Sequence, residues 1–469
     1  METPGGQTAD DRHDNVSVSA RSPLLTDDPS TCTPPRRTAR QKARERGWGE
    51  VFFSSYGQLL NHLEHRLNNA FRNGKLNPDW KDLIGVDPKQ WQLDPATPQP
   101  PLTEAELRAV LERCFLPVHA LGYNWLQCNG ESGEALAQRI TGIMDDYNQK
   151  GCRCEKVILV THSMGGLVGR ALCHPTFGNL QDKILGIVHG VMPAIGAGAA
   201  YRRMRAGFEG GGITNKVLGH TGPRVTAVLA NAPGGLQLLP CDAYGNDWLR
   251  VTTRSGQTLK SLPKGGDPYK EIYARADVWW GLFREEWINP AGLAKSGLEY
   301  TKEHLFKAKE FHQAINATYH PLSYAHYGCD RKHPAFQNVV WQVPDHCPAD
   351  RIDTLKIVLD STQGRLELSA RADEPERKSP FQPPPFPHAV DPRTPVQLPL
   401  TATLQSAAEP GDQTVPMHSA DHQLRSGKFK GVFRQTGYEH QASYEDDTAI
   451  ACTLYSIVRI AQEMKWTTP

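Results

Sequence analysis

A serine stands where an apolar strand gives way to a helix. The stretch KVILVTHSMGGLVGR, residues 156–170, places a run of branched apolar residues directly before Thr-His-Ser-Met-Gly-Gly. A turn this tight strains the serine backbone, and the residues two positions before and after it must be small. Here these are Thr161, in place of the usual glycine, and Gly165. The turn lifts the hydroxyl of Ser163 above the sheet, which predicts a nucleophile.

The helix that follows the serine points its N-terminus at the same place. Free main-chain N–H groups at a helix start favour a developing negative charge. We therefore predict the main-chain N–H of Met164 as the first donor to an oxyanion. An ordinary strand–helix turn with an incidental serine is the alternative, because small-x-Ser-x-Gly matches alone are common.

A serine nucleophile at such a turn is followed along the chain by an acid and then by a histidine. Asp412 lies in the Gly-containing loop GDQTVP, and we predict it as the acid. His440, in GYEHQASYEDD just before the last helix, is the predicted base. His418 and His422 follow Asp412 so closely that one loop would have to supply both roles. Taken alone, the aspartate also fits an Asx turn, and each histidine a surface or capping role.

Strands and helices alternate around the serine, which predicts the α/β class with a mainly parallel sheet flanked by helices. Residues 321–328 and 337–343 continue the strand pattern, and 355–370 alternate on either side of Thr-Gln-Gly, which predicts a hairpin. The predicted strands of the first part span residues 114–121, 156–161 and 184–190, and the predicted helices span 51–67, 103–114, 129–147, 166–173 and 448–464.

The domain organisation follows from composition. Residues 1–45 are rich in Asp, Ser, Thr, Pro and Arg without periodicity, and we predict a disordered N-terminal segment. Residues 46–462 form one domain. An inserted cap is expected at about 191–320, and a second insertion, a β-hairpin with a Pro-rich connector, at about 330–400.

Bulk properties exclude several classes of function. The net charge of +1 gives no broad attraction to nucleic acid, so no nucleic-acid partner is expected. The N-terminus has neither a basic nor an apolar signal region, which predicts a protein that is cytoplasmic as synthesised and, if exported, exported by a signal-independent route. The ten cysteines include no CxxC pair, so no metal site is expected; free thiols are predicted, and a disulfide stays open.

With these motifs in view, the chain resembles the α/β-hydrolase lipases. It is most similar to the lecithin:cholesterol acyltransferase-like and GPI inositol-deacylase-like branch, and to bacterial type VI secretion lipase effectors that attack phospholipids. The likeness covers about residues 46–462. The segments that carry it are GYNW, THSMGG, GDQTVP and EHQASY, with HGVMPAIGA and NAPGGLQLLP.

The resemblance implies a serine lipase or esterase that cleaves carboxylic esters of lipids, including phospholipids, and needs no cofactor. It implies a lipid or membrane substrate, and for an effector a secretion-spike protein and an immunity protein as partners. The aromatic residues Trp279, Trp280 and Phe283 suggest a wall for acyl chains; a plain packed core is the equal alternative. A lipid acyltransferase and a non-catalytic binding protein of the same fold are the alternative functions.

One expected motif is missing. Such enzymes carry an early Pro-Gly or His-Gly loop that gives the second oxyanion donor, and no such loop follows a strand upstream of residue 115. Losing one donor costs on the order of 3 kcal/mol of transition-state stabilisation. We therefore expect another donor, a truncated start or weak activity.

Overall fold

Four strands form a parallel sheet at the centre of the chain. The computed structural model describes residues 22–25, 28, 38–209, 219–371, 374–377 and 400–466. The strand order is β14–β7–β4–β3, with every neighbouring pair parallel. The predicted fold class is confirmed. The strands are β3 (Val157–His162), β4 (Ile184–Gly190), β7 (Ser323–Gly328) and β14 (Phe429–Gln435).

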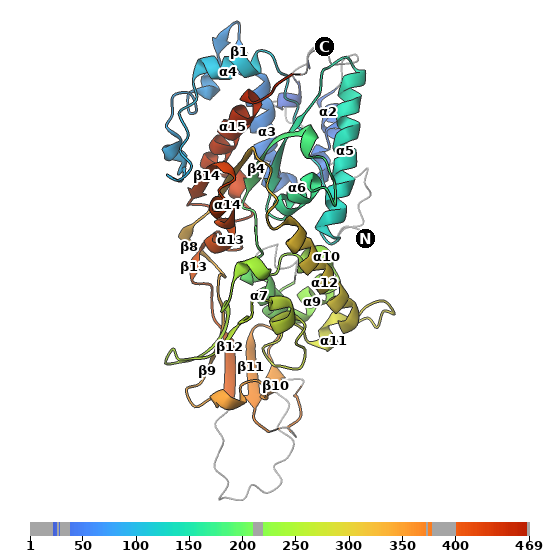
Figure 1. Cartoon of the computed structure of the whole chain (residues 1–469), viewed down its shortest axis with the longest axis vertical. Coiled ribbons are helices and arrows are strands. Elements are labelled where there is room, and N and C mark those ends of the chain that lie inside the picture. The colour runs from blue at the N-terminus through green and yellow to red at the C-terminus, as the bar shows by residue number, and fades with distance from the viewer. Residues whose placement is uncertain are drawn as a thin grey trace, which may run out of the picture.

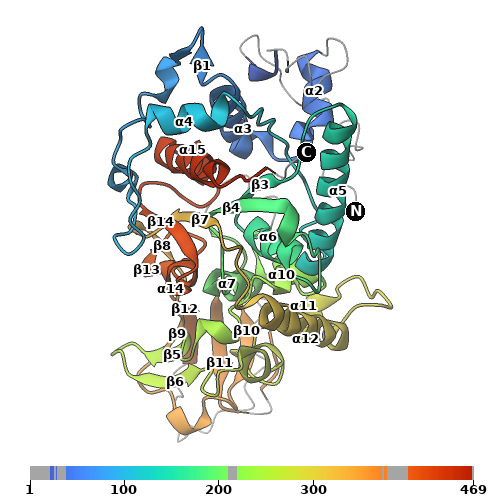
Figure 2. The same cartoon turned by 45° about the horizontal axis from the view of Figure 1, so that its top comes forward.

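Helices cover both faces of this sheet, as the alternating pattern requires (Figures 1 and 2). Successive side chains of a strand point to opposite faces. In β4, Val188 joins the apolar cluster of α3 and α15, whereas Ile187 joins that of α5 and α6. The covering helices are α3 (Phe53–Asn68) and α15 (Asp447–Gln462) on one face, and α5 (Asn129–Gln149) and α6 (Gly165–Cys173) on the other.

The strand expected at 114–121 is wrong: this segment is extended but does not join the sheet. Every second N–H group, from residue 116 to 122, donates to an oxygen of residues 46–68 instead of to β3. The bonds join Leu116 to Asn68 (2.9 Å), Val118 to Glu64 (2.9 Å), Ala120 to Arg46 (2.8 Å) and Gly122 to Glu50 (3.1 Å). As a result, β3 forms the edge of the described sheet.

The two predicted insertions share a second sheet, which lies beyond one end of the central one (Figure 1). Its order is β10–β11–β12–β9–β5–β6, and its pairs are antiparallel except for β5 with β9. The predicted hairpin is confirmed as β10 and β11, with Thr362 and Gly364 at positive φ between them. The strands are β5 (Leu249–Thr253), β6 (Thr258–Leu262), β9 (Val339–Val343), β10 (Lys356–Asp360), β11 (Arg365–Ser369) and β12 (Leu400–Leu404).

Short elements connect and flank these layers. A capping box at Thr103 begins the helix expected at 103–114: the Thr103 hydroxyl accepts from the N–H of Glu106, whose carboxylate accepts from the N–H of Thr103. The remaining helices are α2 (Ala39–Glu45), α4 (Glu104–Leu111), α7 (Gly198–Ala206), α9 (Gly222–Leu229), α10 (Pro233–Leu236), α11 (Glu285–Ile288), α12 (Leu298–Ile315), α13 (Met417–Ala420) and α14 (His422–Arg425), and the remaining strands are β1 (Phe71–Arg72), β2 (Lys75–Leu76), β8 (Asp330–Ala335) and β13 (Glu409–Gly411).

Two sequence expectations need correction at the margins. Order begins before residue 46, because α2 is capped by the Thr38 side chain and Leu24 is buried. The rest of the predicted N-terminal segment and most of the Pro-rich connector lie outside the described residues. Cys152 is disulfide-bonded, so the free-thiol expectation fails for it. The eight other cysteines of the described ranges are free.

Two absences hold for the described part of the chain. None of its helices combines the length and the apolar character needed to cross a membrane. Within the same residues, no three His, Cys, Asp or Glu side chains are grouped so that they could hold a metal ion.

Three histidines lie on the parallel strands: His189 and His326 are fully buried, and His162 is half-buried. His162 ends β3, His189 lies on β4 and His326 on β7. Burial lowers the pKa of each imidazole to about 3, with smaller contributions from neighbouring groups at His162 and His189. All three are therefore neutral in the folded chain at any pH near 7.

This burial makes the stability of the fold depend on pH. In the unfolded chain these histidines bind protons below pH 6.5, whereas the folded chain binds them only near pH 3. The free energy of unfolding should therefore fall as the pH drops below 6.5, by about 1.4 kcal/mol per pH unit for each histidine. Urea unfolding at several pH values measures the slope. His326→Gln should reduce this slope by the contribution of one histidine, about 1.4 kcal/mol per pH unit. An unchanged slope would contradict the assignment.

Candidate active site

Ser163 occupies the strained turn that its sequence context predicts. Its φ is 53°, a left-handed conformation that non-glycine residues rarely adopt. The Ser163 N–H donates to Gly190 O at 2.9 Å, which ties the turn to β4, and α6 starts two residues later. Of the two glycines that follow Ser163, Gly166 has the least space for a side chain, because an added Cβ would lie 2.4 Å from the Met192 sulfur. At Gly165 an added Cβ would make only ordinary contacts, so the steric demand falls one residue later than expected.

Asp412 is held on a short ladder beyond the central sheet. β13 pairs antiparallel with β8, with Gly411 opposite Asp330. The Asp412 side chain is fully buried, and its Oδ1 accepts from the N–H groups of Thr414 (3.1 Å) and Val415 (2.7 Å). These bonds stabilise the carboxylate in a fixed orientation. The loop approaches β7 so closely that a Cβ on Gly328 would lie 2.7 Å from the Asp412 Cβ.

His440 joins the serine to the aspartate. Its Nδ1 lies 2.9 Å from Asp412 Oδ2, and its Nε2 lies 2.8 Å from Ser163 Oγ. Because an ionised carboxylate only accepts, Nδ1 carries the proton, and Nε2 accepts from the serine hydroxyl. The His440 N–H also donates to Asp412 O at 2.9 Å. The structure thus brings together the three residues that the sequence singled out.

The two other histidines that follow Asp412 have different partners. His418 Nε2 lies 2.8 Å from the main-chain oxygen of Tyr244, and His422 Nδ1 lies 2.8 Å from Tyr319 Oη. Neither ring has a hydrogen bond to Ser163 among the described contacts. Only His440 has the geometry of a base for this serine.

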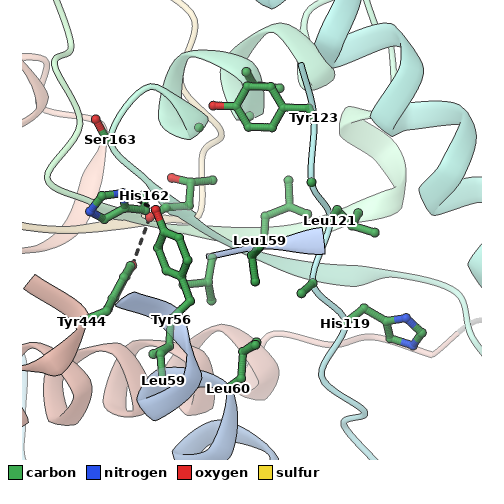
Figure 3. Close-up of a pocket in the computed structure, with 18 of the residues that line it drawn as sticks. Tyr56, Leu59, Leu60, His119, Leu121, Tyr123, Leu159, His162, Ser163 and Tyr444 are labelled. Atoms are coloured by element: carbon green, nitrogen blue, oxygen red, sulfur yellow. Dashed lines mark hydrogen bonds between the residues drawn. The ribbon is translucent and has the colours of Figure 1, made fainter. Parts of the chain in front are cut away.

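A second histidine supports the site, and the sequence did not reveal its role. His162 Nε2 donates to the main-chain oxygen of His440 at 3.1 Å, so its Nδ1 accepts from Tyr56 Oη at 2.9 Å. Figure 3 shows Tyr56 reaching His162 directly beside Ser163. Burial raises the pKa of Tyr56 to about 12, so the phenol stays protonated and able to donate. The only sequence signal is that His162 lies inside THSMGG.

The candidate oxyanion donors are the Met164 N–H and the segment 119–124. The Met164 N–H has no hydrogen-bond partner among the described residues, as a donor reserved for a ligand would have. Across the cavity, Leu121 and Tyr123 line the same space as Ser163 (Figure 3). The N–H of Gly122 donates to Glu50. Because successive N–H groups of an extended chain point in opposite directions, those of Leu121 and Tyr123 point away from α3. The candidate for the role of the missing loop therefore lies downstream of residue 115.

A cavity of about 2940 Å³ opens over Ser163 and His440. It runs from the open edge of β3 to the two insertions, where Val225 and Leu229 of the cap and Phe336 of the second insertion line it. Trp279, Trp280 and Phe283 do not line it. They are at most 3% exposed and belong to the apolar core of the cap, where the Trp279 indole N–H donates to Ile352 O at 2.6 Å. Of the two alternatives that the sequence allowed, these three residues form the plain packed core.

The comparisons with known proteins find a similarity to solved structures. No protein-family model matches this chain, and no curated protein does. Among solved structures, the chain is similar to one described as the crystal structure of the Tle4–Tli4 complex, with a TM-score of 0.75 and 31% sequence identity. The alignment covers 90% of this chain and 83% of that one.

The geometry predicts which side chains a serine-directed probe will report. A fluorophosphonate should label the wild-type protein, because Ser163 Oγ lies against a histidine oriented to take its proton. Ser163→Ala should abolish labelling, and His440→Ala should slow it by orders of magnitude. His418→Ala and His422→Ala are matched controls and should label at the wild-type rate. Loss of labelling in either control, with the fold intact by circular dichroism, would refute the assignment of the base.

Proposed function

Because this chain belongs to the family of the type VI lipase effector Tle4, we propose that it is a serine phospholipase. The observation that carries the proposal is the pair of contacts that His440 makes, at 2.8 Å to Ser163 and 2.9 Å to Asp412. Ser163 lies in a strained turn, and both Ser163 and His440 line a large cavity. The likeness supports the resemblance to type VI lipase effectors and does not extend to the lecithin:cholesterol acyltransferase-like or GPI inositol-deacylase-like branch.

The reaction follows from the direction of these hydrogen bonds. Ser163 Oγ attacks the carbonyl carbon of an acyl ester while His440 Nε2 takes the hydroxyl proton. Asp412 holds the imidazole in the tautomer with its proton on Nδ1 and stabilises the charged ring. His440 then protonates the leaving alcohol, and an acyl-enzyme remains. Water, deprotonated by the same nitrogen, releases the fatty acid and restores Ser163.

The charge that develops on the carbonyl oxygen needs donors aimed at its position. The Met164 N–H at the start of α6 is the first, and the N–H of Leu121 or Tyr123 is the proposed second. This assignment replaces the missing Pro-Gly or His-Gly loop with a segment that also lines the cavity. Each such donor contributes about 3 kcal/mol of transition-state stabilisation.

The acyl chain is assigned to the cap side of the cavity. Val225, Leu229, Leu238 and Phe336 line it there. We place the chain against these residues because Trp279, Trp280 and Phe283 are enclosed by the core of the cap. Burial of methylene groups against this wall favours binding by about 0.8 kcal/mol each.

Protein partners are proposed by analogy. The matched structure is a complex of Tle4 with Tli4, so we propose an immunity protein as a partner of this chain. A secretion-spike protein as carrier and export without a signal peptide remain predictions.

Release of fatty acid from phospholipid vesicles tests the proposed function. Wild-type protein should release fatty acid, and Ser163→Ala should lower the rate by at least about 10⁴-fold, because the nucleophile is lost. His422→Ala serves as the matched control. Product analysis with an added alcohol separates the acyltransferase alternative, which would yield a new ester. Absence of turnover in a folded wild-type protein would leave the non-catalytic binding protein as the better account.

A further inference from the structure

Two arginines of the cap line the cavity that contains Ser163. Arg202 and Arg203 are consecutive residues of α7, which lies where the central sheet meets the cap (Figure 1). Both line the same cavity as Ser163 and His440. Their positive charge lies in a largely apolar space and has no part in the ester chemistry described above.

A single carboxylate serves both guanidinium groups. Glu209 Oε1 lies 3.2 Å from Arg202 Nε, and its Oε2 lies 3.1 Å from Arg203 Nε. Arg202 also donates to the main-chain oxygen of Gly207, and Arg203 Nη2 donates to Thr414 Oγ1 at 3.0 Å. Within the described residues, Arg202 Nη2 and Arg203 Nη1 have no hydrogen-bond partner. The pair therefore holds one net positive charge and unused N–H donors.

The arginine pair contacts the loop that contains Asp412. Arg203 stacks over the Phe208 ring at 4.7 Å, which fixes its plane. Its partner Thr414 lies two residues after Asp412, and the N–H of Thr414 donates to that carboxylate at 3.1 Å. Arg203 is thus two hydrogen bonds away from the residue that orients His440.

The charges around Arg202 and Arg203 favour binding of an anion. Burial lowers the pKa of Arg202. The carboxylate of Glu209 raises this pKa, and the positive charge of Arg203 lowers it further. Besides Glu209, the carboxylates of Glu50, Glu112, Glu155 and Glu439 line the cavity. Glu439, which directly precedes His440 in the chain, is exposed and so screened by solvent. Forked guanidinium donors match the oxygens of a phosphate, and apolar walls strengthen the attraction.

We propose that Arg202 and Arg203 form the subsite for the phosphate of the phospholipid headgroup. This inference rests on the proposed function and names the feature that selects its substrate. The ester lies at Ser163, the acyl chain lies against the apolar wall of the cap, and the phosphodiester faces α7. A neutral glyceride with the same acyl chains would leave the arginine pair without its anion.

The test compares two substrates that differ in the phosphate alone. Phosphatidylglycerol and diacylglycerol with identical acyl chains are presented in the same neutral detergent micelles, so that surface charge does not bias access. The measured quantity is the ratio of kcat/KM for the two lipids. Arg202→Gln and Arg203→Gln should each lower this ratio about tenfold to hundredfold, the loss expected for a charge-assisted hydrogen bond.

Three further variants sharpen the result. Glu209→Gln removes the competing carboxylate and should raise the ratio. Arg254→Gln removes an exposed cap arginine that does not line the cavity and should leave the ratio as in wild type. Thr414→Val removes the hydrogen bond from Arg203 but keeps the charge of the arginine. Its effect on the ratio therefore shows how much of the arginine's role is to position the loop and how much is to bind phosphate. Equal losses on both lipids in the arginine variants, or an unchanged ratio, would overturn the subsite.

A binding measurement makes the inference separable from catalysis. Ser163→Ala protein should bind phosphatidylglycerol micelles more tightly than diacylglycerol micelles, and Arg202→Gln in that background should remove the difference. Hydrolysis of neither lipid by wild-type protein, with this binding difference present, would reject the proposed function and keep the subsite. Tighter binding of inorganic phosphate alone than of micellar phosphatidylglycerol would overturn the headgroup assignment in favour of a free anion.

Discussion

The hydrogen bond between His440 and Ser163 is the contact on which the rest of the site depends. The two residues are 277 positions apart in the chain, and their side chains meet at 2.8 Å. Such a contact persists only if both backbones are fixed independently. The serine is fixed by the turn between β3 and α6. The histidine loop is fixed from three sides: by Asp412, by the His162 ring, and by Gln441, which donates to Ser55 Oγ at 3.0 Å.

Three of the eight non-glycine residues at positive φ in the described chain lie just after strands near the site. Ser163, Val191 and Gln413 have φ values of 53°, 45° and 70°, and each directly follows a strand or its adjoining residue. A β-branched valine at positive φ is a particularly costly conformation. Its N–H donates to His326 O at 2.8 Å, which shows what holds it. The buried strands and their neutral histidines supply the rigid frame that sustains this strain.

The sequence identified the parts of the site whose chemistry is local. The turn at Ser163 is encoded by its immediate neighbours, and the order of acid and base narrowed the choice to Asp412 and His440. The contribution of His162 was not foreseen, because it depends on Tyr56 from a distant helix. The segment 114–121 reads as a strand from its apolar residues, yet α3 and its flanking residues bind the N–H groups on one of its sides. The sequence leaves open whether Trp279 and Trp280 form an acyl wall or a plain core, because composition cannot distinguish a buried core from a cavity lining.

The central claim is that Ser163, activated by His440 and Asp412, attacks a phospholipid ester facing the Met164 N–H. A crystal structure of the protein inactivated by a phosphonate analogue of phosphatidylglycerol tests it most directly. The account predicts a covalent bond from Ser163 Oγ to the phosphonyl phosphorus, with the phosphonyl oxygen within hydrogen-bond distance of the Met164 N–H. A covalent bond to any other residue, or a phosphonyl oxygen directed away from that N–H, would contradict it.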